Sequence, residues 1–189
     1  MTKIFAHRGA SAYAPENTME SFELAAKQGA DGIELDVHVT KDGEVVVTHD
    51  EKIDRVSNGS GFIKDMTLRE LKRLSFHNHM ESYVGAGIPT LREVLEYVST
   101  TNMDVNIELK TGIYWYPQIE EKTAFIVQET GMHDRVIYSS FNHHSIAKIK
   151  EIDSTAETAW LFSDVILNVE QYAKANGVEG LHPAVYHMY

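Results

Sequence analysis

The chain has 189 residues, of which 43% are hydrophobic and 24% are charged, the balance of an ordinary globular domain. A formal net charge of −11 makes it a poor candidate for binding nucleic acid, which attracts basic surfaces. Because the chain contains no cysteine, a disulfide framework and a thiolate zinc site are excluded. This length supports one hydrophobic core and is short for two, so we expect residues 1–189 to form a single domain.

The N-terminal sequence MTKIFAHRG lacks the charged and apolar regions of a secretory leader. No segment reaches the roughly 18 consecutive apolar residues of a membrane-spanning helix. We therefore expect a cytoplasmic protein without stable membrane insertion.

The first predicted strand covers residues 4–6 and ends in His7 and Arg8. A helix is expected over residues 20–28. Asn17 and the glutamate three residues later have the spacing of a capping box, so Asn17 is interpreted as the cap of this helix.

Residues 32–50 begin with two carboxylates on one face of a predicted strand. Glu34 and Asp36 are separated by one residue, and successive side chains of a strand point to opposite faces. The other face of this strand carries Ile33, Leu35 and Val37. Neighbouring carboxylates on a strand with a buried back repel each other and lose hydration, so they need a cation, a shared proton or a basic partner. This pair is the first indication of a metal site.

A Val-rich run follows the turn sequence Lys41-Asp42-Gly43 and ends at His49. The turn is typical of a hairpin. We nevertheless expect the segment to run down the sheet in extended form and up again, without a helix. His49 would then reach the same end of the sheet as Asp36.

Residues 51–89 interrupt the regular pattern. They contain a turn-rich stretch and a short helix from Thr67, with Glu70 at capping-box spacing. Their apolar content is too low for a core of their own, so we interpret them as a small insertion after the third strand. A helix with the same cap spacing begins at Thr90 and is expected to reach about Val98.

Strands and helices alternate over the rest of the chain. Strands are predicted over residues 105–110, 136–140, 158–162 and 178–183, and helices over residues 117–130, 142–151 and 168–176. This alternation predicts a parallel sheet covered by helices.

Polar residues stand at the ends of different predicted strands: His7, Glu34, Asp36, His49, Glu108, Lys110, Ser140 and His182. In a (β/α)8 barrel the strand ends converge on one mouth, whereas an open sheet spreads them along an edge. We therefore predict an α/β fold of the (β/α)8 TIM type. Seven strands are counted and the chain is about 60 residues shorter than a typical barrel, so the last strand–helix unit is expected to be missing. The resulting open edge predicts pairing with a second copy as a possible route to a homo-oligomer.

Three motifs carry a family resemblance: HRGASAYAPENT, GIELDVHVTKDGEVVVTHD and VNIELK. In this order and spacing they resemble the motifs of glycerophosphodiester phosphodiesterases, of the phospholipase-C-like phosphodiesterase superfamily. The resemblance extends to about His182. It implies a TIM-type barrel with a small insertion after the third strand. It also implies hydrolysis of glycerophosphodiesters to glycerol 3-phosphate and an alcohol, with the help of a divalent cation.

The resemblance makes Glu34, Asp36 and Glu108 the expected metal ligands. Three carboxylates without a thiolate favour Mg²⁺ or Ca²⁺, with Mn²⁺ also possible. The alternative is that these carboxylates pair with Arg8 and Lys110 in a buried salt network that holds no metal.

His7 and His49 are the expected acid and base, because imidazole can donate or accept a proton near neutral pH. Which of the two is the acid stays open. So does the nucleophile, which is either the glycerol hydroxyl of the substrate, through a cyclic phosphate, or water. Arg8 and Lys110 would face the phosphate, although Lys110 could equally be the counter-ion of Glu108.

Phe141, Trp160 and His182 are weaker candidates for the pocket of the alcohol group. For Trp160, packing between a strand and a helix explains the residue equally well. His38 and His143 are expected on the surface or in supporting positions.

Two other functions remain open. One is a lysophospholipase-D-type lipid phosphodiesterase, and the other is a catalytically silent barrel that acts as a binding protein. An incomplete barrel favours the silent protein, whereas the intact set of motif residues opposes it.

Overall fold

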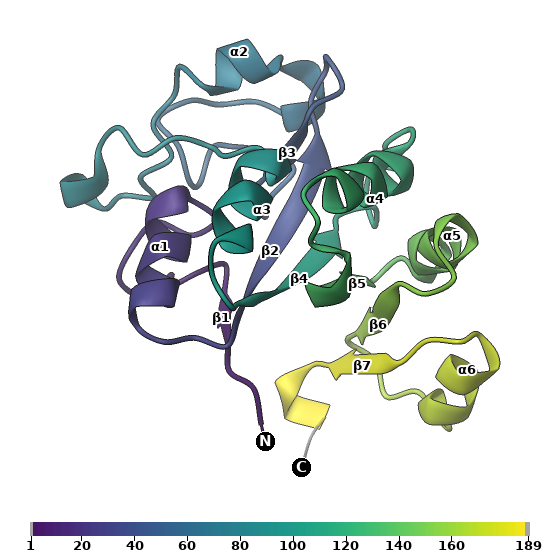
Figure 1. Cartoon of the computed structure of the whole chain (residues 1–189). Helices are drawn as coiled ribbons and strands as arrows, with labels where there is room; N and C mark the ends of the chain where they lie inside the picture. The colour runs from purple at the N-terminus through teal and green to yellow at the C-terminus, as the bar shows by residue number, and fades with distance from the viewer. Residues whose placement is uncertain (1, 188–189) are drawn as a thin grey trace.

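The computed structural model describes residues 2–187 of the chain (Figure 1). Its strands are β1 (Phe5–His7), β2 (Gly32–Val39), β3 (Val45–Val47), β4 (Asp104–Leu109), β5 (Val136–Ser140), β6 (Glu157–Phe162) and β7 (Gly180–Pro183). Its α-helices are α1 (Met19–Lys27), α2 (Leu68–Leu71), α3 (Leu91–Ser99), α4 (Ile119–Glu129), α5 (His143–Ile152) and α6 (Val169–Ala175). The alternation predicted after residue 100 is confirmed.

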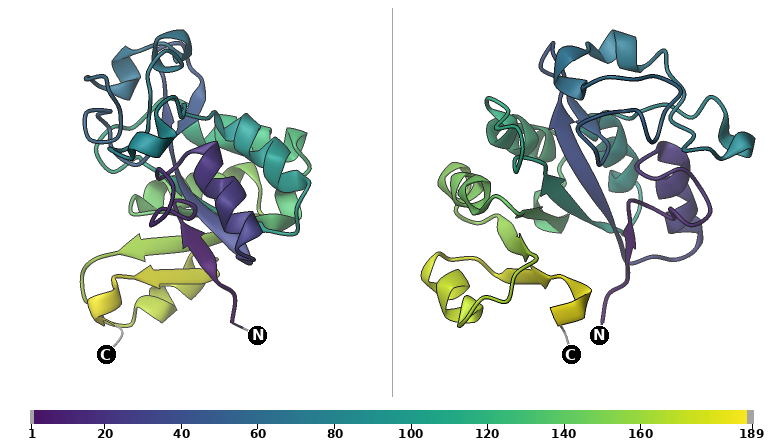
Figure 2. Two further views of the ribbon diagram at one scale, coloured as in Figure 1. Left: turned by 90° about the vertical axis from the view of Figure 1, so that its left-hand side faces the viewer. Right: turned by 180° about the vertical axis from the view of Figure 1, so that it is seen from behind.

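Among residues 2–187, seven strands form one sheet. Six of them stand in the order β1-β2-β4-β5-β6-β7, with all pairs along this path parallel, and β3 joins the sheet beside β2. The sheet curls, and its helices lie on the outer, convex side (Figures 1 and 2). Parallel strands with covering helices and this curl are the geometry of a TIM-type fold. Among residues 2–187, β1 and β7 form the two ends of the path, without a ladder between them.

β3 lies outside this path, because it pairs with β2 in antiparallel orientation through Val37 and Val47. The expected descent and return before His49 is therefore wrong. The turn is tight: Gly43 has a φ of 88° and donates its N–H to Thr40 O at 3.0 Å. The chain reverses direction once, at the turn around Gly43, and β3 then returns along β2 toward the mouth of the sheet. Six strands are parallel barrel strands, one fewer than the sequence suggested.

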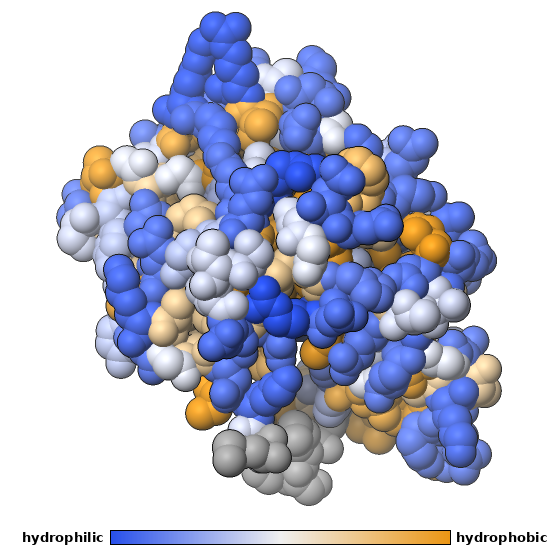
Figure 3. All heavy atoms as spheres, viewed as in Figure 1, coloured by the Kyte–Doolittle hydropathy of each residue, from blue (hydrophilic) through white to orange (hydrophobic). Residues whose placement is uncertain are grey.

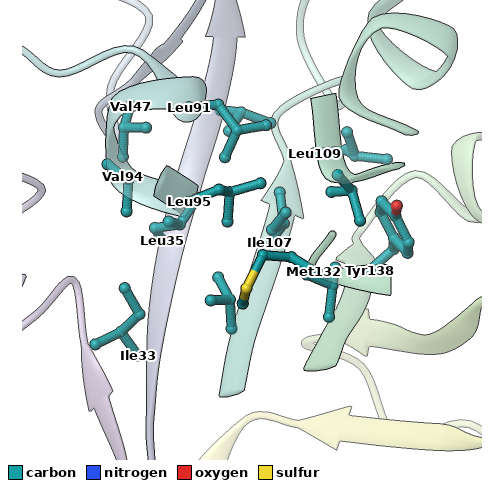
Figure 4. Close-up of a cluster of buried hydrophobic side chains, with 14 of the residues drawn as sticks. Ile33, Leu35, Val47, Leu91, Val94, Leu95, Ile107, Leu109, Met132 and Tyr138 are labelled. Atoms are coloured by element: carbon teal, nitrogen blue, oxygen red, sulfur yellow. The ribbon is translucent and has the colours of Figure 1, made fainter. Parts of the chain in front are cut away.

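The hydrophobic core lies between the sheet and the helices. Leu35 of β2 and Ile107 of β4 point toward Leu91 and Leu95 of α3, and all four side chains are fully buried (Figure 4). Burying each such side chain contributes about 1.5–3 kcal/mol. Because strand side chains alternate, the residues between them are turned to the opposite, concave face of the sheet.

Residues 51–89 lie beyond the carboxyl end of β2, over β3 (Figure 1). They were expected to lack a core of their own, but they form a small buried cluster that is separate from the main core. Its members are Val46, Ile53, Val56, Ile63, Leu71, Phe76 and Ile88. Since Val46 belongs to β3, the cluster fixes this segment to the hairpin.

The predicted capping boxes of two helices are confirmed. Thr67 and Glu70 cap α2, and Thr90 caps α3 in the same way. The face of the molecule in Figure 3 is mainly hydrophilic, with scattered apolar side chains. Within residues 2–187, no helix has the length and apolar character that crossing a membrane requires.

Candidate active site

Three carboxylates lie side by side on the concave face of the sheet. The strand register pairs Glu34 with His7 across β1 and β2, and it pairs Asp36 with Glu108 across β2 and β4. Paired residues of neighbouring strands share a face, and Leu35, between the two acids of β2, faces the helices. The regular pleat therefore brings the predicted metal ligands together.

Each of these carboxylates has an oxygen within 4.8 Å of the others. Asp36 is fully buried and Glu108 is 8% exposed. Burial, with repulsion from Asp36 and Glu108, raises the pKa of Glu34 to about 8. Burial and Asp36 also raise the pKa of Glu108. Acids packed so closely favour a bound cation or a retained proton.

Two basic side chains approach this cluster. Lys110 Nζ lies 2.9 Å from Glu108 Oε1 and 3.6 Å from Asp36 Oδ1. Burial opposes the charged form of Lys110, but Glu108 and Asp36 outweigh it and raise its pKa. Arg8 Nε lies 3.5 Å from Asp36 Oδ2. Arg8 favours the ionised form of Glu34, but burial and the neighbouring acids outweigh it and raise the pKa of Glu34.

A left-handed turn after β1 directs Arg8 toward the cluster. Arg8 has a φ of 58° and Gly9 a φ of 79°. A Cβ on Gly9 would lie 2.3 Å from Ser21 Oγ, so the position requires glycine. In this turn the N–H of Arg8 donates to Glu34 Oε2 at 3.0 Å, and its Nη1 donates to Glu16 Oε1 at 3.1 Å.

Asn17 supports Asp36, a role that its interpretation as a helix cap missed. Its Nδ2 donates to Asp36 Oδ2 at 2.9 Å, and the side chain is buried. The cap of α1 is instead Thr18, which forms the capping box with Ser21. Within residues 2–187 the buried Asp36 Oδ1 has no hydrogen-bond partner, which leaves this atom available to a ligand.

The structure places His49 beside the carboxylate strand. The N–H of Thr48 donates to Asp36 O at 3.0 Å, which continues the hairpin ladder to the residue before His49. His49 Nδ1 lies 2.6 Å from Asp50 Oδ1. Burial opposes the charge of Asp50, but Arg55 and His49 outweigh it and lower the pKa of Asp50 to about 2. As an ionised carboxylate only accepts, His49 Nδ1 carries the proton of this bond.

His38 was expected at the surface or in a supporting position, and it is fully buried. Burial lowers its pKa to about 4, so the ring is neutral at pH 7. Its Nε2 lies 3.0 Å from the backbone O of His49, and its Nδ1 lies 2.9 Å from Tyr116 Oη. Because a carbonyl accepts only, Nε2 is the donor. His38 thus holds the backbone of His49 in place.

His7 and His182 line one cavity on the concave side, with a volume of about 320 Å³. Its lining also includes Phe5, Glu34, Asn106 and Ile137. His7 Nε2 lies 3.8 Å from Glu34 Oε2. Burial, followed by the charge of Arg8, lowers the pKa of His7, and burial lowers that of His182.

Of the other predicted pocket residues, Phe141 follows β5 at the mouth and is 50% exposed. Trp160 points away from the cavity. It pairs with Ser140, whereas the concave face is continued by Ser139 and Ala159. The Trp160 ring stacks on His143, with centroids 4.3 Å apart. Trp160 therefore packs on the outer side of the sheet and does not line the cavity beside His7 and His182.

The sequence profile of the glycerophosphoryl diester phosphodiesterase family matches residues 7–188. The chain belongs to this family. It is accordingly an enzyme of the phosphoric diester hydrolase class, and its three motifs carry the residues described above. A glycerophosphodiester phosphodiesterase from Bacillus altitudinis is 47% identical over 187 residues, which are 98% of this chain and 76% of the relative. The corresponding enzyme from Caldanaerobacter subterraneus subsp. tengcongensis is 44% identical, over 96% of this chain and 75% of the relative.

Solved structures of similar proteins share the fold of this family member. A phosphodiesterase of Oleispira antarctica, solved with its product sn-glycerol-3-phosphate, aligns with a TM-score of 0.91 and 30% identity. The alignment covers 97% of this chain and 75% of that one. A putative glycerophosphodiester phosphodiesterase from Galdieria sulphuraria aligns with a TM-score of 0.89 and 29% identity, over 100% of this chain and 77% of that one.

Proposed function

We propose that this chain hydrolyses glycerophosphodiesters to glycerol 3-phosphate and an alcohol, using a divalent cation held by Glu34, Asp36 and Glu108. The observation that carries the proposal is the packing of these three carboxylates, whose oxygens lie within 4.8 Å of one another on the concave face of the sheet. Burial and repulsion between the acids raise the pKa of Glu34, and a bound divalent cation would offset this repulsion by favouring the ionised carboxylates. The product complex of the Oleispira antarctica enzyme supports the substrate class.

The donor set fits a hard cation. Three carboxylates offer oxygen ligands, and the buried Asp36 Oδ1 has no hydrogen bond to give up on binding. Such sites suit Mg²⁺ or Ca²⁺, with Mn²⁺ tolerated. When bound, the cation polarises a phosphate oxygen and offsets its negative charge.

Arg8 and Lys110 are proposed to bind the phosphate. Both lie within 4 Å of Asp36, so they border the place where a phosphate would sit. The raised pKa of Lys110 keeps this amine charged at neutral pH. Two fixed positive charges would offset the charge that develops on the phosphate oxygens in the transition state. Lys110 is at the same time the counter-ion of Glu108.

His7 and His49 are proposed to move the protons. The lowered pKa of His7 keeps its imidazole neutral at pH 7, which suits a group that accepts the proton of the nucleophile. His49 holds its proton on Nδ1 toward Asp50, which turns Nε2 away from Asp50. With a proton on Nε2 as well, His49 would give that proton to the leaving alkoxide and return to the neutral form with its proton on Nδ1, and the Asp50 carboxylate would stabilise the charged ring before the transfer. The nucleophile is either the glycerol hydroxyl of the substrate or water.

The alcohol group is proposed to occupy the cavity beside His7 and His182. A volume of about 320 Å³ is at the lower end of the range for small-molecule sites, about 300–1,000 Å³. Phe141 does not line this cavity, and its contact with the alcohol group from the exposed position after β5 stays a proposal.

The test is a parallel assay of glycerophosphocholine and lysophosphatidylcholine with added Mg²⁺, followed by ³¹P NMR. We expect glycerol 3-phosphate from glycerophosphocholine, and a transient cyclic phosphate signal if the glycerol hydroxyl attacks. Turnover of lysophosphatidylcholine alone would favour the lysophospholipase-D-type function. Turnover of neither substrate would contradict the proposal.

The remaining structural expectations are also proposals. We propose that residues 1–189 form one barrel domain with residues 51–89 as an insertion. We also propose that the exposed strand edges allow association of two copies. The cytoplasmic location stays a prediction.

A further inference from the structure

Arg55, in the inserted segment, joins two loops at the mouth of the sheet. Its Nη1 and Nη2 donate to Glu16 Oε2 and Oε1 at 2.9 and 2.8 Å. Its Nε and Nη2 donate to Asp50 Oδ2 and Oδ1 at 2.7 and 3.2 Å. One guanidinium therefore binds two carboxylates, each through both oxygens, and this geometry is available to arginine but not to lysine.

Each of these carboxylates also holds a member of the proposed catalytic set. Glu16 Oε1 accepts from Arg8 Nη1 at 3.1 Å. Asp50 Oδ1 accepts from His49 Nδ1 at 2.6 Å. The contacts form a chain from Arg8 through Glu16, Arg55 and Asp50 to His49. It connects the turn after β1, the end of the hairpin and the insertion.

The chain is charged along its length at neutral pH. Burial opposes the charge of Glu16, but Arg55 and then Arg8 outweigh it and lower the pKa of Glu16. The pKa of Asp50 is lowered to about 2, and the two carboxylates raise the pKa of Arg55. An isolated exposed ion pair would contribute little, whereas this arrangement has four charge-assisted hydrogen bonds to carboxylates that are partly buried.

We propose that Arg55 is a positioning residue that sets Arg8 and His49 in one geometry for phosphodiester cleavage. This inference rests on the proposed function. Arg55 holds the Asp50 carboxylate so that it faces His49 Nδ1, which selects the tautomer with Nε2 free for the substrate. It holds Glu16 so that Arg8 stays extended toward Asp36. The inserted segment thereby becomes part of the mechanism without touching the reacting atoms.

The first test compares Arg55→Ala and Arg55→Lys with Arg69→Ala, a control in which an exposed arginine of the same segment is removed. We expect kcat on glycerophosphocholine to fall about 10–100-fold in both Arg55 variants. KM is expected to change less than about twofold, because Arg55 positions groups and does not bind substrate. Arg55→Lys keeps the charge, so it decides the question if Arg55→Ala fails to fold. The control should keep the kcat of the original chain.

The second test does not depend on turnover. Long-range ¹H–¹⁵N NMR of the His49 imidazole should report one tautomer, protonated on Nδ1, in the original chain. In the Arg55 variants we expect averaged nitrogen shifts from two tautomers. Unchanged kcat or unchanged His49 nitrogen shifts in these variants would each overturn the proposal. If the original chain cleaves no glycerophosphodiester, the proposed function fails, and the NMR comparison still decides whether Arg55 orients His49.

Discussion

The two halves of the candidate site are built in different ways. The carboxylate half stands on β2 and β4, where strand register fixes Asp36 opposite Glu108 in a buried position. The histidine half stands at the end of β1 and in the loop after β3, where partly exposed ion pairs orient His49. Dense negative charge must be held by a rigid scaffold, since its repulsion would push flexible segments apart. Proton transfer needs correct orientation, which hydrogen bonds from several loops can supply.

The largest effect on cation binding and turnover is expected when the carboxylate half is removed. A Glu34→Gln/Asp36→Asn variant removes two of three proposed ligands, so we expect divalent-cation binding to disappear in calorimetric titration. Turnover should fall about 10³-fold or more, because charge stabilisation of the phosphate is lost with it. Glu44→Gln, on the exposed turn of the same hairpin, is the matched control. Unchanged Mg²⁺ affinity in the double variant would refute the assignment.

Removal of the histidine half should separate turnover from metal binding. In His49→Gln or His7→Gln we expect kcat to fall about 10²–10⁴-fold with Mg²⁺ affinity unchanged, since neither imidazole is a proposed ligand. His144→Gln, which changes an exposed histidine of α5, should leave both quantities as they are. Full activity in a His7→Gln/His49→Gln double variant would contradict the acid–base assignment.

Asn17 offers a sharper comparison within the carboxylate half. Asn17→Ala removes the donor to Asp36 Oδ2, so we expect metal affinity to fall about 10–100-fold. Thr18→Ala removes the true cap of α1 and should instead lower the free energy of unfolding by about 1 kcal/mol, with metal affinity kept. The reverse pattern in titration and denaturant unfolding would restore the capping interpretation of Asn17.

The support of His49 by His38 is expected to affect stability and its pH dependence more than turnover. The pKa of His38 is about 4 in the folded chain and near 6.5 in the unfolded chain. Between these two pH values the unfolded chain therefore binds more protons than the folded chain. The free energy of unfolding should therefore fall as pH drops from about 6.5 to 4, by up to about 3 kcal/mol from this residue. Urea unfolding at several pH values gives the free energy of unfolding as a function of pH. This free energy should depend less steeply on pH in His38→Gln than in His144→Gln. Equal slopes would show that His38 is not held neutral.

The carboxylate half could be predicted from the sequence because a strand has a period of two. Once the strands are recognised, the spacing of Glu34 and Asp36 places both side chains on one face of the sheet. A third acid, Glu108, stands at the end of another strand and can join them there. Counting the same period along 157–162 would have placed Trp160 on the outer face, as its pairing with Ser140 shows. Of the two explanations of Trp160 that the sequence allows, packing between a strand and a helix is the one that the structure shows.

The histidine half could not be predicted in the same way, because its contacts join distant segments. Arg55 binds Glu16 across 39 positions of sequence, and no local pattern encodes that distance. The direction of β3 was misjudged for a related reason. The turn indicated a hairpin, but the need to bring His49 to the mouth suggested a return run. Because β2 extends beyond the mouth of the sheet, one reversal of the chain is enough to return His49 to the mouth.

The central claim is that a cation bound by the carboxylate half drives phosphodiester cleavage. It is tested most directly by measuring glycerol 3-phosphate released from glycerophosphocholine by chelator-treated protein, before and after Mg²⁺ is restored. Asp36→Asn is assayed in parallel. The account predicts release only after Mg²⁺ is added, and none from Asp36→Asn at any Mg²⁺ concentration. Equal release by the chelated protein, or Mg²⁺-dependent release by Asp36→Asn at the original rate, would contradict it.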